Sequence, residues 1–214
     1  MTGIYVDSIK DASNTKTLAT LSSSAVTLSS DVTVPASVGS SMVFLEKFTA
    51  SSTPLKIFNL DSFTSYNTYV FSLNAILPAT DDSTFTIQVG TSSSSFFSSA
   101  GDYRFTSSHP YYNGSTSGGP FVDSASASLV IAPGMGNNAE YGISGTIRIF
   151  NPISSTVKTS TRGELVSLNS GEYVQARSFA SYRLATTDDA YIKFYFSSGN
   201  IASGTITLYG LKDA

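Results

Sequence analysis

Very few side chains in this sequence are suited to catalysis, because it contains a single histidine, His109, and no cysteine. A Ser-His-acid triad would have to use His109, and no serine lies in a Gly-x-Ser-x-Gly segment, the turn that exposes the nucleophile in one large class of hydrolases. Zinc in proteins is held mainly by Cys and His, so a zinc site here would need mostly carboxylates, which is unusual. Cysteine chemistry is therefore excluded, and a hydrolase triad and a zinc site are disfavoured.

The carboxylates offer two further kinds of chemistry. The acidic pairs Asp81/Asp82 and Asp188/Asp189 lie in predicted turns, where Asp accepts hydrogen bonds from the nearby backbone. Calcium also takes oxygen ligands from turns, so a Ca²⁺ site at either pair is kept as an alternative. Glycoside hydrolysis needs two positioned carboxylates, and no motif selects a pair from the candidates. These candidates are Glu46, Glu140, Glu164, Glu172 and the two Asp pairs. We predict no enzymatic activity and no cofactor.

Recognition by shape is the chemistry that remains. Aromatic rings offer apolar faces to a sugar, while Asn, Asp and Arg supply directional hydrogen bonds. One aromatic-rich segment carries these types close together in the sequence. Its candidate glycan contacts are Asp102, Arg104, His109, Tyr111, Tyr112 and Asn113. The alternative is that this segment packs on its own domain or on a neighbouring subunit.

The composition argues against several classes of partner. Charged residues make up 13% of the chain, the 12 Lys and Arg residues are scattered singly, and the formal net charge is −3. Nucleic-acid binding needs clustered cations that neutralise phosphates, so we predict no nucleic-acid partner. Apolar stretches are only a few residues long, and the N-terminus lacks a basic start followed by an apolar run. We therefore predict neither membrane insertion nor a signal peptide.

Apolar and polar residues alternate along many short segments, which is the pattern of half-buried β-strands. Phe85, Ile87 and Val89, for example, alternate with Thr86 and Gln88. The predicted strands are 43–48, 55–60, 69–77, 85–89, 128–131, 145–150, 164–168, 173–179, 191–196 and 204–209. Turn residues separate them, and helical spacing never runs for three turns. The pattern predicts an all-β fold, an antiparallel jelly-roll-like β-sandwich.

The first 40 residues differ from the rest of the chain. They contain no Phe and only one Tyr, and their β-prone pieces, 6–10, 18–21, 26–28 and 32–35, are too short to bury an apolar face alone. We predict an extended N-terminal arm for anchoring and oligomerisation over 1–40 and a sandwich domain over 41–214. The alternative for 1–40 is a flexible, Ser-rich leader. Within the sandwich, 91–127 is predicted to be mostly loop, with a strand only at 103–106.

Three segments resemble parts of bacteriophage virion structural proteins. The leader at 3–11, with Val32-Thr33-Val34-Pro35, is similar to N-terminal repeats of tail-fibre and virion surface proteins. Residues 189–211 are similar to the closing hairpin of phage structural proteins, and 60–69 resembles the entry to the first long strand of such a domain. The resemblance implies a virion protein made in the host cytoplasm, a homotrimer with a jelly-roll head.

From these observations we predict a non-enzymatic structural component of a phage particle: a short tail fibre, a fibre tip or a capsid decoration. Its arm would dock to other virion proteins and its head would be exposed, with host surface glycans as candidate ligands. The alternative is a free-standing carbohydrate-binding module of the jelly-roll type. A β-fold glycosidase is the third and weakest hypothesis.

Overall fold

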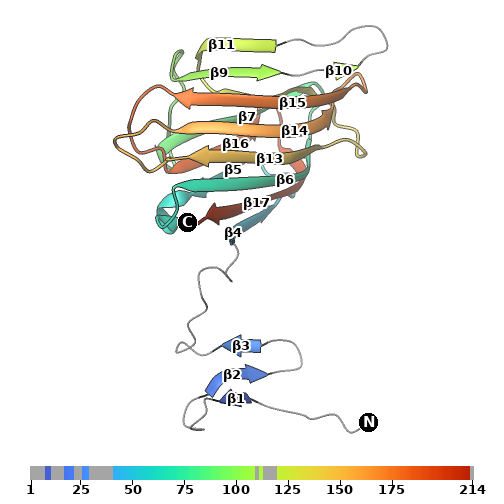
Figure 1. Cartoon of the computed structure of the whole chain (residues 1–214). Coiled ribbons are helices and arrows are strands. Elements are labelled where there is room, and N and C mark those ends of the chain that lie inside the picture. Colours follow the sequence, from blue (N-terminus) through green and yellow to red (C-terminus); the bar gives the residue numbers. More distant parts are fainter. Residues whose placement is uncertain are drawn as a thin grey trace. The chain divides into compact units, whose positions relative to one another are not determined.

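The computed structural model describes residues 41–108 and 126–212 in full. It also gives the strand backbone at 8–10, 17–21, 26–28, 111–112 and 120–125. The chain divides into two compact units, residues 1–40 and residues 41–214 (Figure 1). No helix in the described part of the chain is both long and apolar enough to cross a membrane.

The first unit contains a small antiparallel sheet with the order β1-β2-β3. Its strands are β1 (Ser8–Lys10), β2 (Thr17–Leu21) and β3 (Val26–Leu28). Three of the predicted N-terminal strands therefore form, each within a residue or two of its predicted bounds. The fourth, at 32–35, lies outside the described residues.

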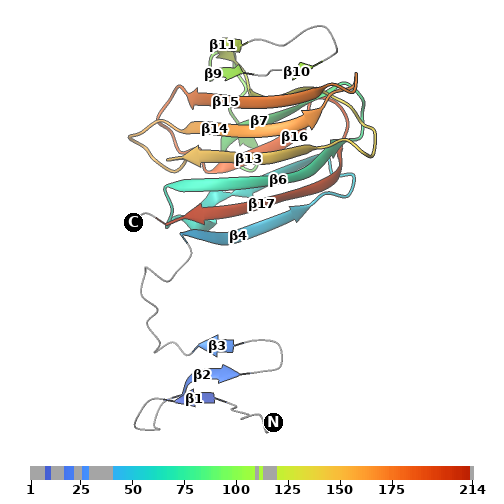
Figure 2. The same cartoon turned by 45° about the vertical axis from the view of Figure 1, so that its right-hand side comes forward.

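The second unit is built from two antiparallel sheets packed face to face, which confirms the predicted antiparallel β-sandwich. In Figure 1 the larger sheet lies in front of strands β5, β7 and β16 of the smaller one, and Figure 2 shows β7 and β16 behind it from a second direction. The larger sheet has the order β11-β9-β15-β14-β13-β6-β17-β4, with β10 paired to β15. The smaller sheet has the order β12-β7-β16-β5, with β8 paired to β7.

The larger sheet comprises β11 (Pro120–Ser126), β9 (Tyr103–Ser108), β10 (Tyr111–Tyr112), β15 (Val174–Arg183), β14 (Ser160–Leu168), β13 (Ile143–Phe150), β6 (Thr68–Pro78), β17 (Ile201–Leu211) and β4 (Met42–Thr49). The smaller sheet comprises β12 (Leu129–Met135), β7 (Ser83–Ser92), β8 (Ser95–Phe96), β16 (Tyr191–Phe196) and β5 (Leu55–Asn59). A 3₁₀ turn, η1 (Leu60–Phe63), joins β5 to β6. All ten strands predicted for this domain are present.

Strict alternation fixes which faces of β15 and β9 are buried. Along β15, every second residue from Gln175 to Arg183 is buried, and the residues between them are exposed. β9 alternates in the same way from Tyr103 to Ser108. Because side chains on a strand point to opposite faces in turn, each of these strands has one face in the core and one on the outer surface of the larger sheet.

An aromatic cluster fills the centre of the sandwich. Phe58, Phe85 and Phe194 of the smaller sheet and Phe71 of the larger sheet are all fully buried. The Phe194 ring centroid lies 5.1 Å from that of Phe71 and 5.9 Å from those of Phe58 and Phe85. These edge-to-face, tilted and stacked contacts join the two sheets, since Phe71 is the member contributed by the larger one.

The segment 91–127 holds more strand than predicted. It contains β8, β10 and β11 in addition to β9, and β11 pairs with β9 from Pro120↔Ser108 to Ser126↔Tyr103. The prediction of a long loop is wrong over 120–126. That stretch, Pro-Phe-Val-Asp-Ser-Ala-Ser, has few large apolar residues, because β11 is an edge strand with one neighbour and a proline at its first position.

Two glycines provide a matched test of close backbone packing. Gly204 (φ +105°) and Gly101 (φ +93°) both adopt a backbone conformation that disfavours a side chain. A Cβ at Gly204 would lie 2.4 Å from the Ala75 carbonyl oxygen, whereas one at Gly101 would meet nothing within 4 Å. We expect Gly101→Ala to lower the unfolding free energy by about 1 kcal/mol through φ strain, and Gly204→Ala by about 3 kcal/mol because overpacking is added. Urea unfolding of both variants measures the difference; equal losses would contradict the packing argument.

Candidate functional site

Two residues of the predicted glycan-contact set lie at or near the start of β9. Asp102 precedes the strand, and its carboxylate accepts a hydrogen bond of 2.7 Å from the backbone N–H of Ser99. Its backbone carbonyl also accepts from the N–H of Leu184 at 3.0 Å. Arg104 is exposed on the outer face of β9, opposite Tyr182 of β15. Asp102 therefore stabilises a turn, while the Arg104 side chain is available to a ligand.

The two tyrosines of that set lie toward the other end of β15. Tyr111 and Tyr112 form β10, which pairs with Gln175 and Val174 at the start of β15, whereas Asp102 lies beside Leu184, just past its end. The structure does not bring Asp102 together with the two tyrosines. The other two members, His109 and Asn113, are outside the described residues, so their part in a sugar site stays a prediction.

Both predicted acidic pairs lie in connections between strands, the first after β6 and the second before β16. The Asp81 carboxylate accepts a hydrogen bond from the Asn137 N–H at 3.2 Å, and the Asp188 carboxylate accepts from the Ala190 N–H at 3.0 Å. The Asp188 hydrogen bond, to the residue two positions on, is the one expected of Asp in a turn, whereas the Asp81 bond joins its turn to a segment 56 residues away in the sequence. Among the described residues, no three His, Asp or Glu side chains are grouped so as to hold a metal ion.

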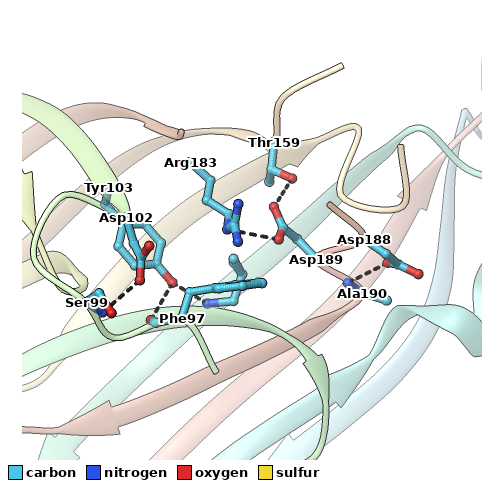
Figure 3. Close-up of polar contacts among 10 residues, drawn as sticks. Phe97, Ser99, Asp102, Tyr103, Thr159, Arg183, Asp188, Asp189 and Ala190 are labelled. Carbon is cyan, nitrogen blue, oxygen red and sulfur yellow. Dashed lines mark hydrogen bonds and ion pairs between the residues drawn. The ribbon is translucent and has the colours of Figure 1, made fainter. Parts of the chain in front are cut away.

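Asp189 lies in the predicted connection between strands, but its side chain points into the protein. Its side chain is fully buried, accepts a 2.5 Å hydrogen bond from the Thr159 hydroxyl, and lies 3.2 Å from Nε of Arg183 (Figure 3). The Arg183 side chain is only 4% exposed. The Nε–H is poorly aligned with the carboxylate oxygen, so the contact is an ion pair without a well-formed hydrogen bond.

Aromatic residues complete the surroundings of this ion pair. The Arg183 guanidinium carbon lies 3.4 Å from the centroid of the Phe97 ring, a cation–π contact. Tyr103 accepts a hydrogen bond from the Val89 N–H at 2.8 Å and donates one to the Phe97 carbonyl at 3.2 Å (Figure 3). Burial raises the pKa of the Tyr103 hydroxyl well above its usual range. The tyrosine therefore stays neutral and holds the 97 segment against β7.

The electrostatics of the ion pair are dominated by burial. Loss of hydration raises the pKa of Asp189 to about 6, although the Thr159 hydrogen bond and the Arg183 charge both act to lower it. With side-chain exposures of 0% and 4%, neither Asp189 nor Arg183 can contact a substrate while the sandwich is closed. We interpret the group as a structural connection between β15 and the segment before β16.

The outer face of the larger sheet carries a shallow depression made of three adjoining hollows. One, of about 220 Å³, is lined by Thr146, Arg148, Phe150, Arg162, Gly163 and Glu164. The second, of about 320 Å³, shares Arg162 with the first and lies over β9 and β15. The third, of about 280 Å³, shares Glu164 with the first and Ser108 and Ser178 with the second. We call this depression, over β13, β14, β15 and β9, the outer groove.

Sequence reasoning did not find the outer groove as a site. Arg148, Arg162 and Glu164 lie on different strands or at alternate positions of one strand, and no motif links them. Among the predicted glycan contacts that the structure describes, Arg104 is the one placed on the outer face of these four strands.

Comparison with known proteins gives no relative from which a function could be transferred. No protein-family model, curated protein or solved structure matches the chain.

Proposed function

We propose that this protein is a non-enzymatic structural component of a bacteriophage particle. In this proposal the N-terminal unit is the assembly element, which joins sister chains and docks to other virion proteins. The β-sandwich is the exposed head, as in a short tail fibre, a fibre tip or a capsid decoration. The resemblance of 3–11, 60–69 and 189–211 to phage structural proteins supports the choice of particle.

The observation that carries the proposal is the register of the small N-terminal sheet. Ile9 is paired with Ala19, and Ala19 with Leu28, so three apolar residues form one row across the sheet. Leu21 and Val26 are paired on the same face. The adjacent row, on the opposite face, consists of hydroxyl residues: Ser8, Thr20 and Thr27.

A single sheet with strands of three to five residues cannot enclose its own apolar row, because burying that row requires a second layer packed against it. Burying that face against the same face of sister chains removes the apolar residues from water and supplies the missing stabilisation. Three copies arranged around an axis would each cover the others. The need for burial is the physical reason for expecting an oligomer, and the resemblance to phage structural proteins is the reason for choosing three copies.

The test is the mass of the full-length protein in solution, compared with a shortened variant that starts at Met42. We expect the full-length chain to be a trimer and the shortened chain to be a monomer, since the shortened chain lacks the N-terminal unit. Sedimentation equilibrium at several concentrations measures both masses. A full-length monomer would contradict the proposal and favour the free-standing carbohydrate-binding module.

Two point variants separate assembly by the apolar face from a general effect of charge. Leu28→Asp places a carboxylate on the apolar face, whereas Thr27→Asp places the same group on the hydroxyl face. We expect Leu28→Asp to dissociate the trimer at least tenfold more readily than Thr27→Asp. Equal effects of the two substitutions would mean that the apolar face is not the contact.

A further inference from the structure

The outer groove contains two arginines at directly opposing positions. Arg148 of β13 is paired with Arg162 of β14, which places their Cβ atoms about 5 Å apart on one face. Like charges directly opposite one another are unfavourable in a sheet. Glu164 relieves one of them through a contact of 3.2 Å with Nη2 of Arg162, and these two side chains are 66% and 67% exposed. In the part of the chain that the structure describes, Arg148 makes no ion pair.

The groove is electropositive on a protein that is acidic as a whole. On the outer face of the four strands β9, β15, β14 and β13, the basic residues are Arg104, Arg148 and Arg162. The one acidic residue on that face of these strands is Glu164. The formal charge of the whole chain, by contrast, is −3. Two neighbouring guanidinium groups in a hollow favour a ligand with carboxylates, because each can bind a carboxylate through two parallel hydrogen bonds.

The floor of the groove is covered with small side chains, several of which bear hydroxyls. Thr106, Ser108 and Ser178 line it together with Ala180, and each of these positions is exposed. Hydroxyls both donate and accept hydrogen bonds, as the hydroxyls of a sugar do. The small side chains leave a broad, shallow surface. Such a surface suits an extended chain of sugar rings more than a single deeply bound molecule.

Aromatic side chains flank this floor. Tyr182 of β15 and Phe150 of β13 stand in one row, separated by Ser160 of β14. Tyr182 is 57% exposed, so the face of its ring can contact a sugar. Arg104 is next in the row, opposite Tyr182. Phe150 lines the groove and is partly buried, whereas Tyr182 and Arg104 stand beside the groove on the same face. Cations, hydroxyls and one well-exposed aromatic ring therefore share this surface.

From this combination we infer that the outer groove binds a carboxylate-bearing polysaccharide, with Arg148 and Arg162 contacting its carboxylates. An acidic peptide fits the site less well, because the groove lies in the middle of a sheet. Peptides gain affinity by adding a strand at a sheet edge or by filling apolar pockets, and the groove offers neither. The inferred site is on a different unit from the assembly element, so it goes beyond the proposed function.

Polygalacturonate is the first probe, because its methyl-esterified form is the same polymer without the negative charges. Using the full-length protein, we expect polygalacturonate to bind at least tenfold more tightly than the methyl-esterified polymer. We expect the binding to weaken as salt is raised, since salt screens exposed charges. Equal binding of the two polymers, or no binding of either, would overturn the inference. Tighter binding of polyglutamate or polyphosphate than of polygalacturonate would also overturn it, by indicating a peptide or a phosphate polymer.

Three matched variants locate the site, each measured with polygalacturonate. Arg148→Gln and Arg162→Gln should each weaken binding at least tenfold. Lys47→Gln removes the same charge from the outer face of β4, which is outside the groove, and should change the affinity less than twofold. Equal losses for all three variants would mean that only the net charge matters, which would contradict a built site. The mass of each variant in solution reports assembly separately, so failure of this inference is distinguishable from failure of the proposed function.

Discussion

Asp189→Ala is expected to lower the unfolding free energy by about 3–5 kcal/mol. The substitution leaves the Arg183 guanidinium buried without its carboxylate and the Thr159 hydroxyl without its acceptor, and an uncompensated buried charge is costly. Arg183→Ala should cost a similar amount, because it also removes the cation–π contact with Phe97. Denaturant unfolding of each variant measures the loss.

The exposed Arg162–Glu164 pair is the natural control, because its N···O distance is also 3.2 Å. We expect Glu164→Ala to change the unfolding free energy by less than about 1 kcal/mol, since water and salt screen an exposed pair. The double variant Arg183→Ala with Asp189→Ala should lose less than the sum of the two single variants, because neither partner remains as an isolated charge. A loss equal to the sum would indicate that the two side chains do not interact.

The same pair makes the stability depend on pH in a definite direction. The pKa of Asp189 rises from 3.8 to about 6 on folding, so the folded protein holds its proton more tightly than the unfolded chain. This contribution to stability is greatest below about pH 4 and falls as the pH rises to about 6, by about 3 kcal/mol. The measurement is the unfolding free energy of the native protein minus that of Asp189→Asn at pH 4 and pH 7. An increase in this difference with pH would mean that Arg183 lowers the pKa of the carboxyl more than burial raises it.

The fold could be predicted from the sequence because alternation in the strands reports burial directly. The ten predicted strands of the sandwich all form, and each is either clearly alternating or rich in aromatic and β-branched residues. β11 was missed because it lies at an edge of the sheet and has less need of apolar residues. Its pairing with β9 depends on contacts distant in sequence rather than on its own composition.

The buried ion pair and the outer groove could not be predicted from the sequence, for two different reasons. Arg183 follows Phe179 by four residues on β15, so the two side chains lie on the same, buried face of the strand. The alternation itself therefore places this arginine inside the sandwich. Its partner Asp189 lies in a loop whose sequence reads as an ordinary turn, and no local signal indicates that the loop folds inward. The outer groove depends on the order β13-β14-β15-β9, in which β9 lies beside a strand far from it in the sequence. Spacing along the chain cannot reveal such a neighbour.

Phe194→Ala should be among the most damaging single substitutions in the sandwich, with an expected loss of about 3–5 kcal/mol. Phe194 is fully buried and contacts rings from both sheets, with centroid distances of 5.1 Å to Phe71 and 5.9 Å to Phe58 and Phe85. Its removal leaves a cavity that these three rings cannot fill without leaving their positions on separate strands. The loss is measured by denaturant unfolding of the shortened chain that starts at Met42, so that assembly does not contribute.

Phe44→Ala is the matched control for Phe194→Ala, because it removes the same side chain from a different environment. Phe44 lies on the edge strand β4, is 58% exposed, and contacts Tyr209 edge to face at a centroid distance of 6.2 Å. A pair of this kind contributes about 1 kcal/mol, and no cavity forms when one ring faces water. Similar losses for the two variants would mean that the sandwich adjusts to fill the space left by Phe194. In that case the centre of the sandwich would be packed loosely, and the aromatic cluster would not be what holds the two sheets together.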